Sequence, residues 1–329
     1  MSSFQLSSLV FLQILQFQIA DFPQSVYQCS LLYIHKSFLY TCFHKRSDYI
    51  KQNTLQISFN KDDSWIILSP IEQSIKHKIE SVGTPLKDWN IRINRGILTG
   101  YNEAFIIDKA KRNELIEQDP KSAEIIRPIL RGKDIRRYSY DFANKYLITT
   151  YNEYTDSNEI KHPSININDY PAVKKHLDCY WNEINKRQDK GDTPYNLRRC
   201  AYMDDFNKPK IAWNRIASKK SFGLIDEGIY IQDSMHFITG ENIEYLAATL
   251  NSSLFIWLMN SIVGESAGGN AGNADNVKNL RILKPTNEID CKITELLKNN
   301  DSESIDRLIN QLYLLTEEEI QFISSSVKL

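Results

Sequence analysis

The stretch Gly96-Ile-Leu-Thr-Gly-Tyr-Asn-Glu-Ala-Phe-Ile-Ile-Asp108 places a glycine-containing turn before a short apolar run. Glycine adopts backbone conformations that tight turns require, so Gly96 and Gly100 mark a reversal of the chain. The apolar run Ala104–Ile107 then predicts a strand. The two glycines leave two interpretations open. The turn either serves folding alone or lets the backbone come close to a bound partner.

The residues on the N-terminal side of this turn predict a strand and a helix. Trp65–Leu68 is a short apolar run typical of a buried strand. Pro70 is suited to the first turn of a helix. Ile71, Ile75 and Ile79 recur every four residues and therefore share one helical face. Further upstream only Val26–Ile34 predicts a strand.

The residues on the C-terminal side predict a helix that begins at Asp119-Pro120, with the aspartate as N-cap. Pro128 is expected to kink or end this helix. The apolar residues assigned to it are Ile125, Ile126, Ile129 and Leu130. Tyr146–Thr150 predicts the next strand, and Pro171–Lys186 an amphipathic helix.

Short strands and turns are expected from Lys210 to Thr239, followed by a long helix from Glu241 to about Ile262. Two or three short helices are expected after Pro285, and Thr316 with Glu319 forms a capping box for the last. The predicted fold class is α+β, a mixed, strand-rich domain with helices gathered toward the C-terminus. Three parts are expected: a poorly patterned segment 1–64, a central mixed domain 65–285 and a helical tail 286–329.

Composition indicates an ordinary globular protein, with 42% hydrophobic and 25% charged residues among 329 and a net charge of −1. The near-zero net charge means that only local clusters can indicate a polyanionic partner. Five scattered cysteines without a Cys-x-x-Cys pair favour neither zinc nor disulfides and suggest a cytoplasmic protein. The apolar stretch Leu9–Ala20 is shorter than a membrane span, so no membrane partner is expected.

No catalytic motif emerges from the residues. Amino-methyltransferases grip the target amine with an Asn/Asp-Pro-Pro-Tyr/Phe loop, and this sequence contains no Pro-Pro dipeptide. The Gly-rich stretch Gly264–Gly272 follows a helix and precedes none, so it predicts a loop rather than a cofactor site. Glu159-Ile-Lys161, with Asp141 and Asp156 upstream, is a weak candidate for a Mg²⁺ nuclease site.

Three basic clusters predict contacts with nucleic acid, because Lys and Arg neutralise phosphates while Arg and Asn read base edges. The alternative for each cluster alone is a solvated face. The first spans Arg131–Tyr138, the second Lys186–Arg199 and the third Phe206–Ile225. The residues expected to contact DNA are Gly96, Thr99, Gly100, Arg131, Lys133, Arg136, Arg137, Arg187, Lys190, Arg198, Arg199, Asn214, Arg215, Lys219 and Lys220.

Several stretches in order resemble the TaqI-like C-terminal specificity domain of type II restriction enzymes that fuse methyltransferase and nuclease. The resemblance extends from about Trp65 to the C-terminus. The stretches that carry it are Gly96–Asp108, Ile125–Tyr138, Tyr170-Pro-Ala-Val173, Arg187–Gly191, Lys210-Ile-Ala-Trp213, Leu250-Asn-Ser-Ser253, Leu280–Pro285 and Ile305–Ile320.

The resemblance implies recognition of double-stranded DNA for an adenine-specific methyltransferase and endonuclease. It also implies a methyltransferase domain or subunit, in cis or in trans, that would use S-adenosylmethionine, and a nuclease that would use Mg²⁺; neither cofactor is expected in this chain. The departure from the family is the missing catalytic portion, of which segment 1–64 is a candidate remnant. The alternative hypothesis is a truncated, non-functional fragment of such an enzyme.

Overall fold

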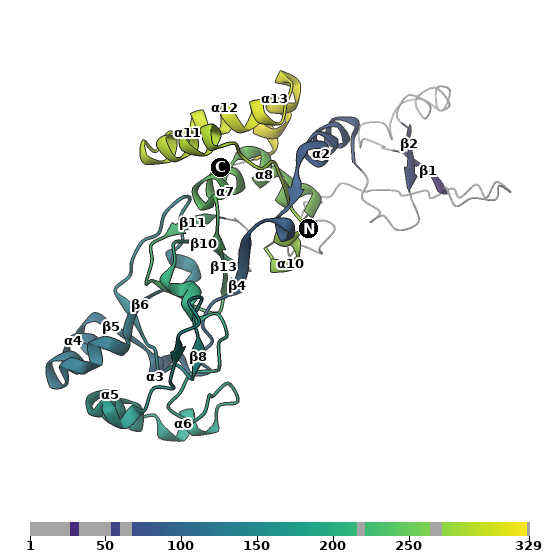
Figure 1. Cartoon of the computed structure of the whole chain (residues 1–329). Helices are drawn as coiled ribbons and strands as arrows, with labels where there is room; N and C mark the ends of the chain where they lie inside the picture. The colour runs from purple at the N-terminus through teal and green to yellow at the C-terminus, as the bar shows by residue number, and fades with distance from the viewer. Residues whose placement is uncertain (1–26, 33–53, 60–67, 216–220, 264–271, 328–329) are drawn as a thin grey trace, which may run out of the picture. The chain divides into compact units, whose positions relative to one another are not determined.

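The computed structural model describes all residues except 1–26, 33–53, 60–67, 216–220, 264–271 and 328–329 (Figure 1). The chain divides into two compact units, Met1–Ser69 and Pro70–Leu329. In the first unit, β1 (Tyr27–Leu32) pairs antiparallel with β2 (Thr54–Phe59). The strand predicted at Val26–Ile34 is thus confirmed, whereas that at Trp65–Leu68 lies outside the described residues except for Leu68.

The second unit begins with the predicted helix, α2 (Pro70–Val82), which has Pro70 in its first turn. Ile75 and Ile79 are fully buried, as their spacing predicts. On the helix surface, Ser74 and Lys78 donate hydrogen bonds of 2.7 and 2.6 Å to the Glu319 carboxylate. Glu319 belongs to the last helix, so these bonds join the two ends of the unit.

The central sheet has the order β11-β10-β13-β4, and all three pairings are antiparallel. Both β4 and β10 pair with β13, so these two strands run in the same direction and end at the same edge of the sheet. β10 and β13 are buried along almost their whole length. The strands are β4 (Ile91–Arg95), β10 (Lys210–Asn214), β11 (Phe222–Ile225) and β13 (Met235–Gly240).

The second sheet has the order β12-β6-β7-β5, and β12 runs parallel to β6. Its strands are β5 (Ile106–Asp108), β6 (Ile126–Leu130), β7 (Lys145–Ile148) and β12 (Tyr230–Ile231). β7 confirms the strand predicted at Tyr146–Thr150. The strand predicted at Ala104–Ile107 is placed too early, because Asn102–Phe105 forms a helical turn, α3, that buries Ala104 and Phe105.

The helix predicted after Asp119 is wrong beyond its first turn. Asp119 caps a 3-10 helix, η3 (Pro120–Ile125), and its carboxylate accepts a hydrogen bond from the Lys121 N–H. Pro128 cannot donate the backbone bond that a helix needs, and the chain continues instead as β6. A short apolar run fits a buried strand as well as a helix, and here pairing with β7 decides between them.

Two predicted helices are divided. Pro171–Lys186 forms α5 (Pro171–Asp178) and α6 (Trp181–Lys186). The stretch predicted at Glu241–Ile262 forms α7 (Ile243–Leu250), α8 (Ser253–Trp257) and the π-helix η7 (Leu258–Val263). Asn251 and Ser252 interrupt it because Ser252 caps α8, while the Asn251 side chain bonds to β11.

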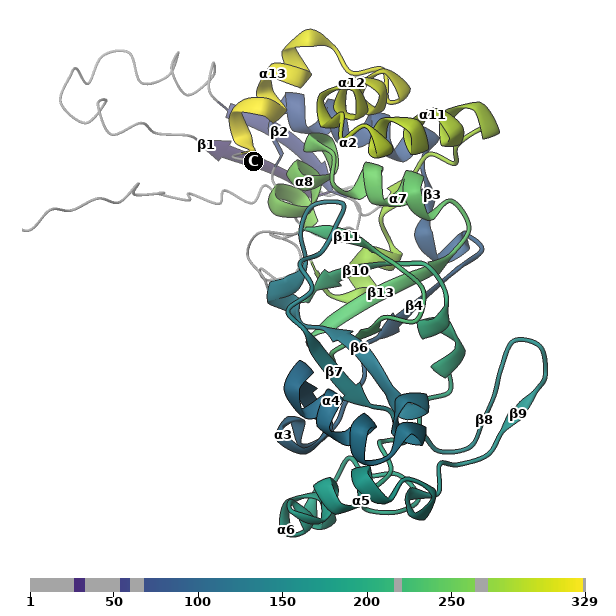
Figure 2. The same ribbon diagram turned by 90° about the vertical axis from the view of Figure 1, so that its left-hand side faces the viewer.

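Three helices follow Pro285, as predicted: α11 (Asn287–Lys298), α12 (Ser302–Leu312) and α13 (Glu317–Ser326). The capping box of Thr316 and Glu319 is confirmed. Figure 2 shows these helices with α2, α7 and α8 at one end of the second unit and α3 to α6 at the other, with the sheets between them. The predicted α+β class is confirmed.

The remaining elements are short. The stretch Leu280–Pro285, which resembles the closing strand of the specificity domain, contains β14 (Arg281–Ile282), and β14 pairs with β3 (Thr84–Pro85). A hairpin is formed by β8 (Tyr154–Thr155) and β9 (Lys161–His162). The other helices are η2 (Leu86–Asp88), α4 (Lys109–Gln118), η4 (Gly132–Asp134), η5 (Ile167–Asp169), η6 (Met203–Asn207) and α10 (Ala274–Lys278).

Within the described part of the chain, no single helix has the length and apolar character to cross a membrane. The bent pair Ile243–Leu250 and Ser253–Val263 meets both requirements by length and composition only. Most of its side chains are buried in the protein.

Candidate nucleic-acid interface

The carboxyl ends of four strands meet around one tight turn, residues 232–235. β4 and β10 end at the same edge of the central sheet, and β12 and β6 end together in the second sheet. The segment after β4 joins the two sheets through a parallel bridge between Ile97 and Gln232. Loops that follow all four strands are thereby gathered in one place.

Each residue of the 232–235 turn is hydrogen-bonded through its backbone to a neighbouring segment. Two of the bonds use N–H groups of the turn and two use its carbonyls. The bonds are Gln232 N–H to the Leu130 carbonyl (3.0 Å), Asp233 N–H to the Ile97 carbonyl (3.0 Å), Arg215 N–H to the Ser234 carbonyl (3.2 Å) and Gly96 N–H to the Met235 carbonyl (3.0 Å). The turn is therefore held from three sides.

Glycines permit this close assembly. A Cβ on Gly96 would lie 2.2 Å from the Gln232 carbonyl oxygen, and one on Gly132 would lie 2.4 Å from the Asn214 side-chain nitrogen. Gly100 has a left-handed backbone, with φ of 69°. The close approach at Gly96 is thus to the chain itself, which favours the folding interpretation at this position.

Three of the four cations in the first basic cluster are engaged in internal contacts. Arg131 forms two bonds, of 3.0 and 2.9 Å, with the buried Asp134 carboxylate. Arg136 pairs with Asp141 at 2.7 Å, and Arg137 donates to the Asn251 carbonyl at 3.0 Å. Lys133 is exposed, and its side-chain ammonium has no hydrogen bond or ion pair with any described residue, while its backbone carbonyl accepts a bond of 2.8 Å from Arg136. Lys133 is therefore the cation of this cluster that is available to a phosphate.

Arg187, in the second cluster, joins two backbone segments of the protein through hydrogen bonds. Its side chain is buried and donates to the carbonyls of Thr99, Pro194 and Asn196. Its guanidinium lies 4.4 Å from the centre of the Phe105 ring. Burial lowers the pKa of Arg187 to about 10. The structure thus assigns Arg187 to packing, in contrast to the phosphate or base contact expected from the sequence.

The neighbours of Arg187 are exposed. Arg198 pairs with Asp189 at 3.3 Å, and Arg199 pairs with Asp192 at 2.6 Å. The Lys190 ammonium donates to the Asn185 carbonyl at 2.9 Å. These cations lie close to the Gly96–Gly100 segment, because a Cβ on Gly100 would lie 3.2 Å from the Asp189 Cβ. Thr99, also predicted to contact DNA, is buried and donates to the Asn102 side chain at 2.7 Å.

In the third cluster, Asn214 and Arg215 stand at the carboxyl end of β10, beside the 232–235 turn. Lys219 and Lys220 lie outside the described residues. Two other lysines of the cluster are engaged in internal contacts. Lys208 pairs with Asp204 and Asp205 at 3.1 and 3.0 Å. Lys210 is fully buried, and burial lowers its pKa to about 8.

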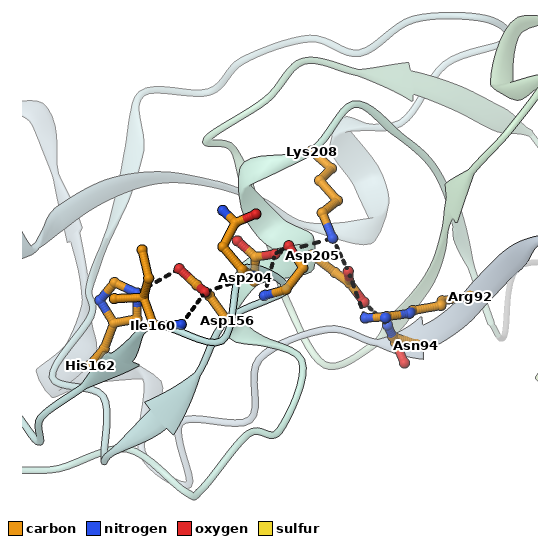
Figure 3. A network of polar contacts seen from close by, with 10 residues as sticks. Arg92, Asn94, Asp156, Ile160, His162, Asp204, Asp205 and Lys208 are labelled. Atoms are coloured by element: carbon orange, nitrogen blue, oxygen red, sulfur yellow. Dashed lines mark hydrogen bonds and ion pairs between the residues drawn. The ribbon is translucent and has the colours of Figure 1, made fainter.

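Figure 3 shows that Lys208 belongs to a polar network beside the β8–β9 hairpin. Asp205 is fully buried and also accepts bonds from Arg92 and Asn94. Asp204 accepts a bond of 2.6 Å from the Ser157 hydroxyl, which fastens the hairpin to η6. This network connects the hairpin to β4.

Asp156, a member of the candidate Mg²⁺ nuclease site, lies in the same region of the protein. Asp156 binds His162 at 2.9 Å, Lys161 pairs with Glu153, and Asp141 pairs with Arg136. Glu159 occupies the hairpin turn, with φ of 64°. The four candidate side chains are therefore not gathered into one site. Among the described residues, no group of three or more His, Cys, Asp or Glu side chains could hold a metal ion.

Residues 127–271 match the family profile of the TaqI-like C-terminal specificity domain. The match confirms the resemblance for a segment that begins in β6 and includes the three basic clusters and the 232–235 turn. Gly96–Asp108, Leu280–Pro285 and Ile305–Ile320 lie outside the matched residues.

Two solved structures are also similar at 12% sequence identity. One is the type IIL restriction-modification enzyme MmeI in complex with DNA, with a TM-score of 0.46, covering 83% of this chain and 39% of that one. The other is the type IIG restriction endonuclease BpuSI, with a TM-score of 0.43, covering 75% of this chain and 31% of that one. The chain therefore spans less than half the length of either. Comparison with curated proteins gave no match.

The sequence patterns did not identify the side chains of the 232–235 turn as candidate DNA contacts. Arg95 at the end of β4 donates a hydrogen bond of 2.8 Å to Asp233, and the preceding residue, Gln232, is half-buried. In sequence, Gln232-Asp233-Ser234 is an ordinary polar turn between short strands. Only the pairing of β6 with β12, which are about a hundred residues apart, places it beside the basic loops.

Proposed function

We propose that this chain recognises a specific sequence in double-stranded DNA for a restriction-modification system of the adenine-specific methyltransferase and endonuclease type. The observation that carries the proposal is that the segment matching the specificity domain contains both the exposed cations and the 232–235 turn, which is bonded to the strand ends that precede Lys133 and Arg215. Phosphate contacts fix a protein on DNA, and side chains between them read the base edges.

Phosphate binding is assigned to Lys133 and Arg215, which follow β6 and β10, and to Arg198 and Arg199 in the 187–199 segment. Lys133 lies in η4, just after β6, and its exposed ammonium needs no rearrangement to meet an anion. Arg198 and Arg199 would exchange an exposed carboxylate partner for a phosphate, which costs little because exposed ion pairs contribute little to stability. Arg215 stands where β10 leaves the sheet.

Catalysis is assigned to a methyltransferase domain or subunit that acts with this chain in cis or in trans. S-adenosylmethionine and Mg²⁺ would be bound there, and the complex would work on cytoplasmic DNA. This part of the proposal rests on the resemblance and on the absence of a Pro-Pro dipeptide from the sequence.

Selection from a pool of randomised DNA duplexes by the purified chain, across a salt series, tests the proposal. An enriched motif that persists at moderate salt is the expected result. For a phosphate contact, Lys133→Ala should weaken binding to all sequences alike and lower the slope of log K against log salt by about 1. Lys298→Ala, at the end of α11, is the control. Weak binding without a motif would contradict the proposal and favour the truncated-fragment hypothesis.

A further inference from the structure

We propose that Gln232 reads a base edge and is a specificity-determining residue of this domain. The inference rests on the proposed function and deepens it, because it separates a base contact from the phosphate contacts around it. Gln232 is the first residue of the 232–235 turn, at the point where the two sheets are bridged.

The backbone of Gln232 is held in place before any ligand arrives. Its N–H donates to Leu130 and its carbonyl accepts from Met235, both at 3.0 Å. The absence of a side chain at Gly96 lets that carbonyl approach closely. A side chain that contacts a base from a backbone held in this way loses less conformational entropy on binding than a side chain on a loop without such bonds.

The side-chain amide of Gln232 is uncommitted. It forms no hydrogen bond with any described residue, and its polar atoms are not among the buried atoms that lack a partner, so they reach solvent. Its neighbour Asp233, by contrast, is occupied by Arg95. Gln232 is therefore the side chain of the turn that offers a free amide, with a donor and an acceptor on separate atoms, whereas Ser234 offers a single hydroxyl.

The surroundings fit a base edge between phosphates. Leu130, which accepts the Gln232 N–H bond, directly precedes the loop that contains Lys133. On the other side, the Arg215 backbone is bonded to Ser234, two residues along the same turn. Each of the two segments bonded to the turn thus contributes a cationic residue, while Gln232 itself carries a neutral amide. In the major groove, a glutamine amide pairs with N6 and N7 of adenine, so an A·T pair is the expected target.

The test compares motifs selected from randomised duplexes by the whole chain and by Gln232→Ala, Gln232→Glu and the control Gln311→Ala on the exposed face of α12. Gln232→Ala should abolish the preference at one A·T pair and keep every other position. Affinity for the wild-type motif should fall about 5- to 100-fold, as expected for loss of a bidentate base contact. Gln232→Glu, which keeps the size, should shift the preference at that pair toward cytosine.

Other outcomes separate the two proposals. If the wild-type chain enriches no motif, the proposed function is overturned and this inference with it. If the wild type enriches a motif and both Gln232 variants enrich the same one, only the inference is overturned. Equal weakening on every sequence would also overturn it, because that result identifies a phosphate contact. Urea unfolding midpoints equal to the wild-type value should accompany the expected result.

Discussion

The side-chain amide of Asn251 forms both possible hydrogen bonds with the backbone of Phe222. Its oxygen accepts from the Phe222 N–H at 3.0 Å, and its nitrogen donates to the Phe222 carbonyl at 2.7 Å. Phe222 lies in β11, an edge strand of the central sheet, and the Tyr138 N–H donates to the same carbonyl at 3.1 Å. A side chain between α7 and α8 thereby closes the edge of the strand next to the basic loops.

Asn251→Ala should destabilise the protein, because it leaves two buried polar groups of Phe222 without their side-chain partner. The expected loss is about 2–4 kcal/mol in the free energy of unfolding, measured by urea denaturation. Asn182→Ala, on the exposed face of α6, is the matched control and should leave the midpoint unchanged. A variant as stable as the wild type would show that water or a backbone shift replaces the amide.

Gly96→Ala should be far more damaging than Gly228→Ala. The new methyl group at position 96 would lie 2.2 Å from a backbone oxygen, so the 232–235 turn must move; the expected cost is about 3 kcal/mol or more. At position 228, φ is 74° and nothing lies within 4 Å, so only backbone strain of about 1–2 kcal/mol applies.

Thermal unfolding of both variants checks this order. Selection on randomised DNA adds a second measurement, because only Gly96→Ala should also change the enriched motif. Equal destabilisation by the two substitutions would contradict a tight contact at Gly96.

Sequence patterns predicted elements well where one interaction decides the local structure. Pro70 and the spacing of Ile75 and Ile79 predicted α2, and the capping box of Thr316 and Glu319 predicted the start of α13. Ile125–Leu130 was misassigned because an apolar run has no period of its own. Its partner β7 lies beyond a loop, and sequence alone does not show the pairing.

The candidate site was predictable only in outline. The basic clusters identified loops that the fold brings near one another, but charge alone cannot tell Lys133 from Arg187. One cation is exposed and the other is buried among three carbonyls. Gln232 is uncharged and lies in a polar turn without a distinctive motif, so its sequence does not indicate a DNA contact. Its position becomes informative only once β12 is paired with β6.

Arg187→Lys should destabilise the protein although it keeps the positive charge. Lysine cannot reproduce the planar fork that bonds three carbonyls and stacks on Phe105, so a loss of about 2 kcal/mol is expected. Arg199→Lys, at an exposed ion pair, should leave the urea midpoint unchanged. If DNA binding falls for Arg187→Lys at full stability, Arg187 contacts DNA after all and its packing role is secondary.

Lys210 should make stability depend on pH above neutrality. Its ammonium is fully buried and donates to the carbonyls of Asp226 and Ile229 at 3.1 and 3.2 Å, and burial lowers its pKa to about 8. In the unfolded chain a lysine has a pKa of about 10.4. Between these two values the unfolded state holds more protons than the folded state, so stability rises with pH.

Below pH 8 both states are protonated and this contribution is absent. The free energy of unfolding should therefore increase by about 2 kcal/mol from pH 8 to 10 in the wild type relative to Lys210→Met. Above pH 10 the ionisation of buried tyrosines should lower the stability of both proteins, because residues such as Tyr245, whose pKa burial raises to about 12, ionise more easily when unfolded. Taking the difference between the two proteins cancels that contribution. Parallel curves between pH 8 and 10 would mean that Lys210 titrates in the folded protein as it does in the unfolded chain.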